Sequence, residues 1–455
     1  MLTLRNIRVW DTGEIIDMVI PSADARNQPE DGGVIEGDFD ATGLTVAPGF
    51  ADPHVHFRDP GQTYKESMVS GCRAAASGGY TNVLIMPNTV PAMDGRAVKA
   101  GEPGAEEVLS AGYSDVIDYL QHYERVHDVS LPVRYDLCVC ASKDRAGVEA
   151  SDPADWLRHL DGHDMDGKDA WQLAHPVTAI SDDGAAVTPG LLDQVLANVK
   201  ESGLYLIEHC EHHDTGAVND GPVSRKLGVP GIPEDTELKI VARDIKKARE
   251  TGVHIHFQHV STAISFDAIR KAKAEGLPIT CETAPHYLVF HDGMLQEDGR
   301  FKMNPPIRGE EDRQALIAGI LDGTVDMIAT DHAPHSAEEK AGGLEKSLNG
   351  IVGLETAFPV LYTELVRPGV LTLAQLIDLM HTNPAKRFGI GAPLEEGATA
   401  DFTVFDLDAE KTIQPEHFLS MGKSSPFAGR SVFGTCLLTI CGGKIAWQAE
   451  GGASR

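Results

Sequence analysis

The sequence lacks a membrane span, a secretory leader and a disulfide framework. No stretch approaches the roughly 20 uninterrupted apolar residues of a membrane helix. The segment Met1 to Trp10 carries Arg5 and Arg8 where a signal peptide would have an apolar core. The seven cysteines are odd in number and lie in apolar contexts, which favours buried, reduced thiols. Cys138 and Cys140 have the wrong spacing for a zinc knuckle, so we interpret both as strand residues. These absences predict a cytoplasmic protein.

Basic residues are scarce. The chain has 39 lysines and arginines against 68 aspartates and glutamates, a formal net charge of −29. Nucleic acids and anionic membranes would repel such a surface, so we exclude both as partners. An acidic surface around a basic pocket still suits an anionic small molecule, although surface acidity can also reflect solubility or a salty cytoplasm. An apolar content of 42% is typical of a globular protein.

Both ends of the chain show the alternation and turns of short β-strands. Near the N-terminus the expected strands are Leu2 to Trp10, Glu14 to Ile20 and Gly43 to Val46. Near the C-terminus they are Asp401 to Phe405, Cys436 to Ile440 and Ile445 to Trp447. We therefore predict one small β-sandwich domain, built from residues 1–50 and 389–455 together.

Between the two ends, apolar runs alternate with amphipathic segments. The candidate strands are Val46 to His56, Thr81 to Met86, Arg134 to Cys140, Ala170 to Ile180, Tyr205 to His209, His254 to His259, Pro278 to Cys281 and Asp326 to Thr330. Phe266 to Glu275 and Arg313 to Leu321 have helical spacing. Eight strands that alternate with helices predict an α/β fold, a (β/α)8 TIM barrel over residues 51–388.

Polar residues lie where a barrel of this kind has its active site, at the carboxyl ends of the strands. Seven of them fall at or just past the end of a candidate strand: His54, His56, Asn88, Asp183, His209, His259 and Asp331. His54 and His56 share one face of a strand because strand side chains alternate. An isolated pair of this spacing is more often two loop histidines, and a single strand-end histidine is usually structural. The combination with aspartates suits zinc, which binds imidazole and carboxylate ligands.

The two aspartates differ in what the residues alone indicate. Asp331 ends the last candidate strand, where it could ligate a metal and exchange a proton with a metal-bound water. Asp183 lies in an Asp-Asp-Gly pattern that is as typical of a turn as of a ligand. The barrel context favours a ligand, because strand four supplies no lysine that could be carbamylated to bridge two metals. Lys168 lies well before the strand end, and no lysine follows until Lys200.

Four motifs together resemble the dihydroorotase family of the amidohydrolase superfamily, and most closely its long bacterial type. They are the runs Asp52 to Gly61, Met86 to Thr89, Lys302 to Pro306 and Ile328 to His335. Phe358-Pro359 and the terminal run Gly443 to Trp447 extend the likeness over nearly the whole chain. The resemblance implies a reversible, zinc-dependent cyclisation of N-carbamoyl-L-aspartate to L-dihydroorotate in pyrimidine biosynthesis.

The resemblance also implies a role for each site residue. One zinc ion is held by His54, His56, Asp183 and Asp331, and the other by Asp183, His209 and His259. Asp183 and a hydroxide bridge the two ions, with no carbamylated lysine, and Asp331 is the catalytic proton carrier. Arg58, Asn88 and His335 bind the substrate's carboxylate, and Asn304 contacts the ring. A planar guanidinium can take a carboxylate through two parallel hydrogen bonds.

Two alternatives remain on the same fold. Allantoinase shares the paired histidines and the strand-eight aspartate, but Arg58 together with Asn88 points away from it and from hydantoinases. A silent homologue, kept as a structural partner of aspartate transcarbamoylase, should have lost ligands, and none is lost here. The family also implies a homo-oligomer. The chain departs from many relatives at Leu348-Asn349-Gly350 in the loop 338–350, and His212 and His213 are interpreted as surface residues.

Overall fold

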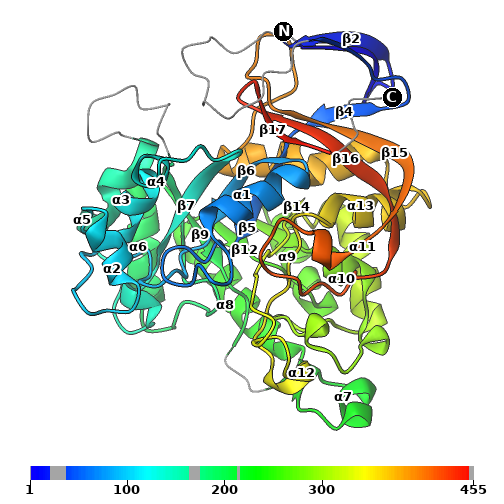
Figure 1. Cartoon of the computed structure of the whole chain (residues 1–455). Helices are drawn as coiled ribbons and strands as arrows, with labels where there is room; N and C mark the ends of the chain where they lie inside the picture. Colours follow the sequence, from blue (N-terminus) through cyan, green and yellow to red (C-terminus); the bar gives the residue numbers. More distant parts are fainter. Residues whose placement is uncertain (1, 21–36, 163–174, 213–215, 450–455) are drawn as a thin grey trace.

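The computed structural model describes residues 2–20, 37–162, 175–212 and 216–449. Two sheets organise this part of the chain, a mixed sheet at one end and a parallel barrel next to it (Figure 1). The mixed sheet contains β1 (Leu2–Val9), β2 (Ile15–Ile20), β3 (Gly37–Asp40), β4 (Thr45–Pro48), β15 (Phe402–Thr412), β16 (Ser431–Cys441) and β17 (Lys444–Gln448). Because β15 pairs antiparallel with β4, the two ends of the chain meet inside one sheet. The prediction of a small β domain built from both ends is confirmed, and its strands form this single sheet.

The barrel follows the order of the chain. Its strands are β5 (Phe50–Val55), β6 (Tyr80–Ile85), β7 (Arg134–Cys140), β8 (Val177–Ser181), β9 (Tyr205–Glu208), β12 (Ile255–Phe257), β13 (Ile279–Thr283) and β14 (Met327–Ile328). Neighbouring strands run parallel, and a parallel bridge between Val55 and His332 joins the two ends of this sheet. Most of the strand residues are buried, as expected when helices cover one face of a parallel sheet and the other faces the barrel core. The predicted barrel is confirmed.

Helices surround the barrel, and two short ones, residues 222–227 and 343–346, lie away from its strands at the bottom of the view (Figure 1). They are α1 (Met68–Ser77), α2 (Ala105–Ser110), α3 (Val116–Gln121), α4 (Tyr123–His127), α5 (Pro153–Trp156), α6 (Leu192–Ser202), α7 (Pro222–Leu227), α8 (Asp235–Thr251), α9 (Ala263–Ala274), α10 (Pro285–Val289), α11 (Glu310–Leu321), α12 (Gly343–Lys346), α13 (Ala357–Leu361), α14 (Leu373–Ile377) and α15 (Asn383–Phe388). A short ladder pairs β10 (Val218–Asn219) with β11 (Gly231–Ile232). The described residues include no helix that is long and apolar enough to cross a membrane.

Several predicted boundaries move for identifiable reasons. The run expected as one strand from Val46 to His56 is two strands, because the chain leaves the mixed sheet at Gly49 and enters the barrel. A Cβ at Gly49 would lie 2.2 Å from a methyl carbon of Thr81, so only glycine fits this crossing. Helix α9 begins before the predicted Phe266, since the Thr262 side chain caps it. The predicted strand from Ala170 begins in residues that the structure does not describe, and the domain limits at 50 and 388 stay a prediction.

The cysteines lie as predicted. All seven are buried and none forms a disulfide. Cys138 and Cys140 belong to β7, inside the barrel wall. His212 is exposed, as expected, whereas His213 lies outside the described residues.

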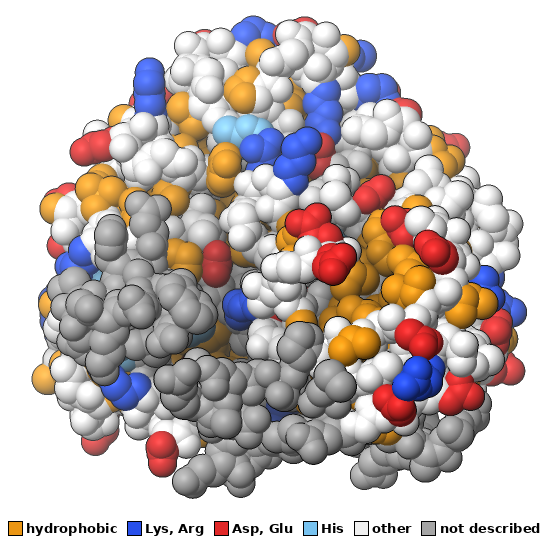
Figure 2. Space-filling model, turned by 90° about the horizontal axis from the view of Figure 1, so that it is seen from above, with side chains coloured by type: hydrophobic (Ala, Val, Ile, Leu, Met, Phe, Trp, Pro, Cys, Tyr) orange, Lys and Arg blue, Asp and Glu red, His pale blue; other side chains and the backbone are white. Residues whose placement is uncertain are grey.

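The net charge of −29 predicts that salt stabilises the fold. Acidic side chains lie at several separate places on the face in Figure 2, so their repulsion is spread over the surface. Raising NaCl from 0.1 to 1 M shortens the Debye length from about 10 Å to about 3 Å and screens that repulsion. We expect the thermal unfolding midpoint, followed by circular dichroism, to rise over this range. A midpoint that falls or stays constant would show that surface repulsion does not limit stability.

Candidate metal centre

Six potential metal ligands meet at the carboxyl ends of the barrel strands. His54 lies in β5 and His56 directly after it, while the others follow β8, β9, β12 and β14: Asp183, His209, His259 and Asp331. All six side chains are buried. Two groups of three could each hold a metal ion, one made of His54, His56 and Asp183 and the other of Asp183, His209 and His259. Asp183 belongs to both.

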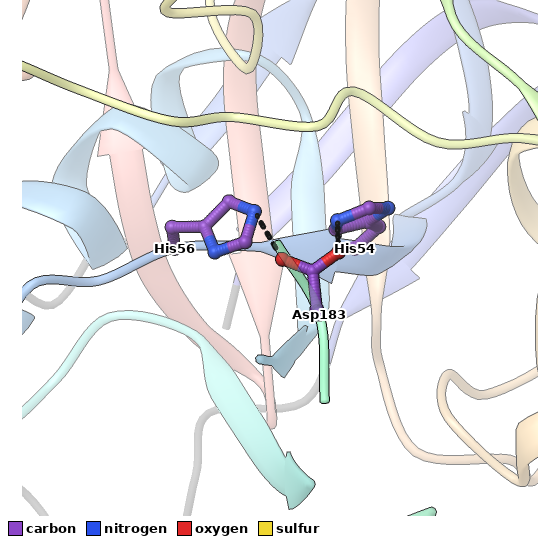
Figure 3. A group of neighbouring side chains, drawn as sticks. All are labelled: His54, His56 and Asp183. Carbon is purple, nitrogen blue, oxygen red and sulfur yellow. Dashed lines mark ion pairs between the residues drawn. The ribbon is translucent and has the colours of Figure 1, made fainter. Parts of the chain in front are cut away.

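The first group is arranged around the carboxylate of Asp183, with the imidazoles of His54 and His56 on either side of it (Figure 3). His54 Nε2 lies 3.3 Å from Asp183 Oδ1, and His56 Nε2 lies 3.3 Å from Asp183 Oδ2. Asp331 Oδ1 completes this side at 3.5 Å from His54 Nε2 and 3.2 Å from His56 Nε2. These four side chains are the set that the sequence predicts for one ion.

The second group shares Oδ1 of the same carboxylate with His54. His209 Nδ1 lies 3.4 Å from Asp183 Oδ1 and 2.9 Å from His259 Nε2. Since Asp183 presents one oxygen to His56 and the other to His209, it stands between the two groups. A carboxylate in this position is suited to bridge two ions.

The donor set fits a divalent metal of zinc's kind. With metal–ligand bonds of about 2.0–2.1 Å, the ligand atoms of a tetrahedral zinc site lie roughly 3.3 Å apart. The nitrogen–oxygen distances around Asp183 are 3.3 to 3.4 Å. Asp183 Oδ1 is buried and accepts no hydrogen bond in the structure. A buried carboxylate oxygen without a donor, surrounded by imidazole nitrogens, is typical of a metal ligand.

The charges of these groups depend strongly on one another. Burial alone would raise the pKa of Asp183, but the imidazoles of His56 and His54 outweigh it and hold the pKa well below its usual value. Burial is likewise outweighed at Asp331, whose pKa falls to about 2 beside His54 and His56. Both carboxylates are therefore ionised at neutral pH, as ligation requires.

Two of the six residues have unusual backbone conformations. His259 has a φ of 34° and Asp331 a φ of 49°, in the left-handed region that non-glycine residues seldom adopt. Each such residue costs about 1–3 kcal/mol, and the surrounding packing has to impose it. The backbone thus turns sharply at two strand ends to aim these side chains inward.

Each of three imidazoles is held from behind through its second ring nitrogen. His54 Nδ1 lies 2.7 Å from Glu282 Oε1, and His56 Nδ1 lies 2.9 Å from Asn88 Oδ1. His209 Nε2 lies 3.4 Å from Glu211 Oε2. Such contacts set the tautomer and the ring orientation of a metal-binding histidine. The sequence reasoning missed Glu282, although it directly follows the candidate strand Pro278 to Cys281 and obeys the strand-end rule.

Three of the four residues expected to bind substrate contact the surroundings of these donors. Asn88 touches the first group through His56, and Asn304 donates to Glu211, which also contacts His209. Arg58 donates from Nε to the carbonyl of Pro334, three residues after Asp331, at 3.4 Å. Burial lowers the pKa of Arg58 to about 10, so its guanidinium remains charged at neutral pH.

The loop 338–350, where the sequence departs from relatives, is fastened by a lysine. Lys340 Nζ donates to the carbonyl oxygens of Lys302, Leu348 and Gly350 at 2.9, 2.7 and 2.7 Å. The loop in turn fixes His335, whose Nε2 lies 2.7 Å from the carbonyl oxygen of Asn349. Lys340 thereby ties the segment that carries Asn304 to the one that carries His335.

Comparison with known proteins defines the class. The model of the amidohydrolase family matches residues 45–446. This match covers the barrel and most of the mixed sheet, so the chain belongs to the amidohydrolase family.

Within this class the chain is similar to dihydroorotases. It is 42% identical over 420 residues to the dihydroorotase of Bacillus cereus (strain AH820), a match of 90% of this chain and 89% of the relative. The dihydroorotase of Bacillus anthracis (strain CDC 684 / NRRL 3495) matches to the same extent. The resemblance predicted from the motifs is confirmed.

Solved structures support the fold. The dihydropyrimidinase from Brevibacillus agri NCHU1002 superposes with a TM-score of 0.73 at 22% identity, over 97% of this chain and 94% of its own. The D-hydantoinase from a Bacillus sp. AR9 gives a TM-score of 0.73 at 21% identity, over 98% and 95%. At this level of identity the likeness concerns the fold alone.

Asp182 and Asp183 should respond differently to replacement. Asp183 lies among the imidazoles, whereas Asp182 accepts hydrogen bonds from the backbone and hydroxyl of Ser142. We expect Asp183→Ala to lower metal affinity about tenfold or more, since even outer partners of metal ligands contribute that much. Asp182→Ala is the matched control and should keep its metal. Metal content after dialysis, measured by atomic absorption, checks both, and the reverse pattern would exchange the two roles.

Proposed function

We propose that this protein is a dihydroorotase, which hydrolyses the ring amide of L-dihydroorotate to N-carbamoyl-L-aspartate and catalyses the reverse cyclisation. The observation that carries the proposal is the convergence of all six expected ligands at one barrel mouth, in a chain 42% identical to dihydroorotases. A silent homologue would lack part of this set. A cytoplasmic homo-oligomer, with aspartate transcarbamoylase as a candidate partner, belongs to the same proposal and rests on the family resemblance.

We further propose that the donors hold two zinc ions. His54, His56, Asp183 and Asp331 would bind one, and Asp183, His209 and His259 the other, with Asp183 shared. Zinc in such a site polarises a carbonyl oxygen and lowers the pKa of a coordinated water. Asp183 would take the place of a carbamylated lysine as the bridge between the ions. Activity should therefore not depend on added bicarbonate. Lys168, considered from the sequence, lies outside the described residues.

The chain's own residues would orient the substrate and move a proton. Arg58, Asn88 and His335 bind the carboxylate of dihydroorotate, and Asn304 contacts its ring. Asp331 takes a proton from the attacking water and delivers it to the departing ring nitrogen. In the reverse direction Asp331 takes the proton from the ureido nitrogen of N-carbamoyl-L-aspartate.

Hydrolysis of dihydroorotate by the purified protein tests the function, and Asp331→Asn tests the proton carrier. The zinc-loaded protein should open the ring of L-dihydroorotate, and removal of zinc with a chelator should abolish the reaction. Asp331→Asn should lower turnover about a hundredfold or more, in line with the contribution of general acid–base catalysis. A spectrophotometric ring-opening assay measures both.

Substrate analogues serve as the control for this test. Allantoin and hydantoin lack the carboxylate of dihydroorotate, so turnover of either in preference to dihydroorotate would assign the protein to another branch of the family. Near-normal turnover by Asp331→Asn would remove that residue from the mechanism and leave the assignment of the substrate intact.

Replacing Arg58 by Met should weaken substrate binding without removing metal. A lost charge-assisted hydrogen bond costs about 1.5–3 kcal/mol. Because Arg58 donates to the carbonyl of Pro334 and forms no hydrogen bond with the six ligands in the described part of the chain, we expect this loss as a raised KM with kcat largely kept. Steady-state kinetics and metal analysis on the same sample separate the two effects. Loss of zinc at unchanged KM would contradict the proposed role of Arg58.

A further inference from the structure

A second arginine lies beside the candidate centre without an acidic partner. Arg145 belongs to a short 3-10 turn after β7, Lys143–Arg145, and is partly exposed. Its Nη1 donates to the backbone carbonyl of Asp183 at 2.8 Å. Within the described ranges this is the one hydrogen bond of the guanidinium, and no carboxylate pairs with it. Four of its five N–H groups are therefore available to another acceptor.

The guanidinium lies next to the residues expected to bind substrate. A Cβ placed on Gly184 would be 2.8 Å from Arg145 Nη1 and 3.9 Å from Asn88 Nδ2, so both side chains flank the same point beside Asp183. Gly184 has a φ of 85° and no side chain, which lets the guanidinium lie directly on this turn. Asn88 is one of the residues expected to bind the substrate's carboxylate, so Arg145 lies beside that part of the candidate site.

The loop that carries Arg145 is well fastened. Asp182 accepts from the backbone N–H of Ser142 at 3.0 Å and from its hydroxyl, and that hydroxyl accepts from Gly147 N at 2.9 Å. Asp144 N donates to Asp94 Oδ2 at 2.7 Å. Arg145 is thus presented by a turn with fixed ends and not by a free surface loop. Asp182, which precedes Asp183 in the chain, holds this turn through Ser142.

We propose that Arg145 is a further specificity-determining residue, which binds the substrate's carboxylate together with Arg58. The proposal rests on the function proposed above. A carboxylate has about four acceptor positions and can accept from two guanidinium groups at once. Carboxylates surround the histidines here, so an anionic substrate needs positive charge from the chain on its other side. Arg58 and Arg145 both donate to backbone carbonyls and form no ion pair within the described ranges, so both can supply it.

The variant Arg145→Gln tests this role, since glutamine keeps an N–H donor for the carbonyl of Asp183 and removes the charge. We expect KM for L-dihydroorotate to rise about tenfold or more, as for loss of a charge-assisted contact, with kcat and bound zinc unchanged. Competitive inhibition by dihydrouracil, which lacks the carboxylate, should keep the wild-type inhibition constant. Arg145→Lys should restore part of the affinity.

A matched variant removes a different charge from the same turn. Lys143 pairs with Glu149 at 2.5 Å, so Lys143→Gln should leave KM unchanged. If Arg145→Gln loses zinc or kcat at constant KM, Arg145 only supports Asp183, and the proposal is wrong. An active wild-type enzyme with an unaffected Arg145→Gln variant overturns this inference alone. A wild-type protein that does not hydrolyse dihydroorotate overturns the proposed function as well.

Discussion

The bridge between Val55 and His332 is the constraint on which the centre depends. It joins the first barrel strand to the segment that follows the last one, and His56 N donates to the carbonyl of His332 at 2.8 Å beside it. His56 and Asp331 are 275 positions apart in the chain, yet this closure places them in contact. Without it the barrel would be an open sheet, with His54 and His56 at one edge and Asp331 at the other. Closure of the sheet thus brings Asp331 to His54 and His56.

Polar side chains around the histidines fix the orientation of the imidazole rings. Glu282, Asn88 and Glu211 each hold one imidazole from behind, so the nitrogens that face Asp183 are set before any ion arrives. Glu282 also lies 3.0 Å from His256 Nε2, which extends the network down into the barrel. Asn304 joins this network because it donates to Glu211. Asn304 and His209 are therefore joined through the carboxylate of Glu211.

The periodicity of apolar residues in the sequence predicted the barrel strands and the polar side chains at their ends. Alternation placed His54 and His56 on one face, and the ends of apolar runs located Asp183, His209, His259 and Asp331, which the structure brings together. The break at Gly49 was missed because the apolar run continues through it, and only the contact with Thr81 reveals the crossing. Arg145 and Lys340 could not be found, since their positions follow from loop hydrogen bonds between segments far apart in sequence. The individual roles of the ligands and substrate contacts remain predictions.

Because the first and last barrel strands meet, side chains that lie together in the candidate centre are synthesised at very different times. A ribosome releases His54 and His56 early, but Asp331 and its closing neighbour His332 emerge nearly 280 residues later. Contacts of such sequence separation form late, after the local helices and strand pairs. The growing chain consequently carries His54, His56 and, later, Asp183 before Asp331 is synthesised. The contacts of Asp331 with His54 and His56 therefore belong to the complete barrel, in which the first strand and the segment after the last strand are joined.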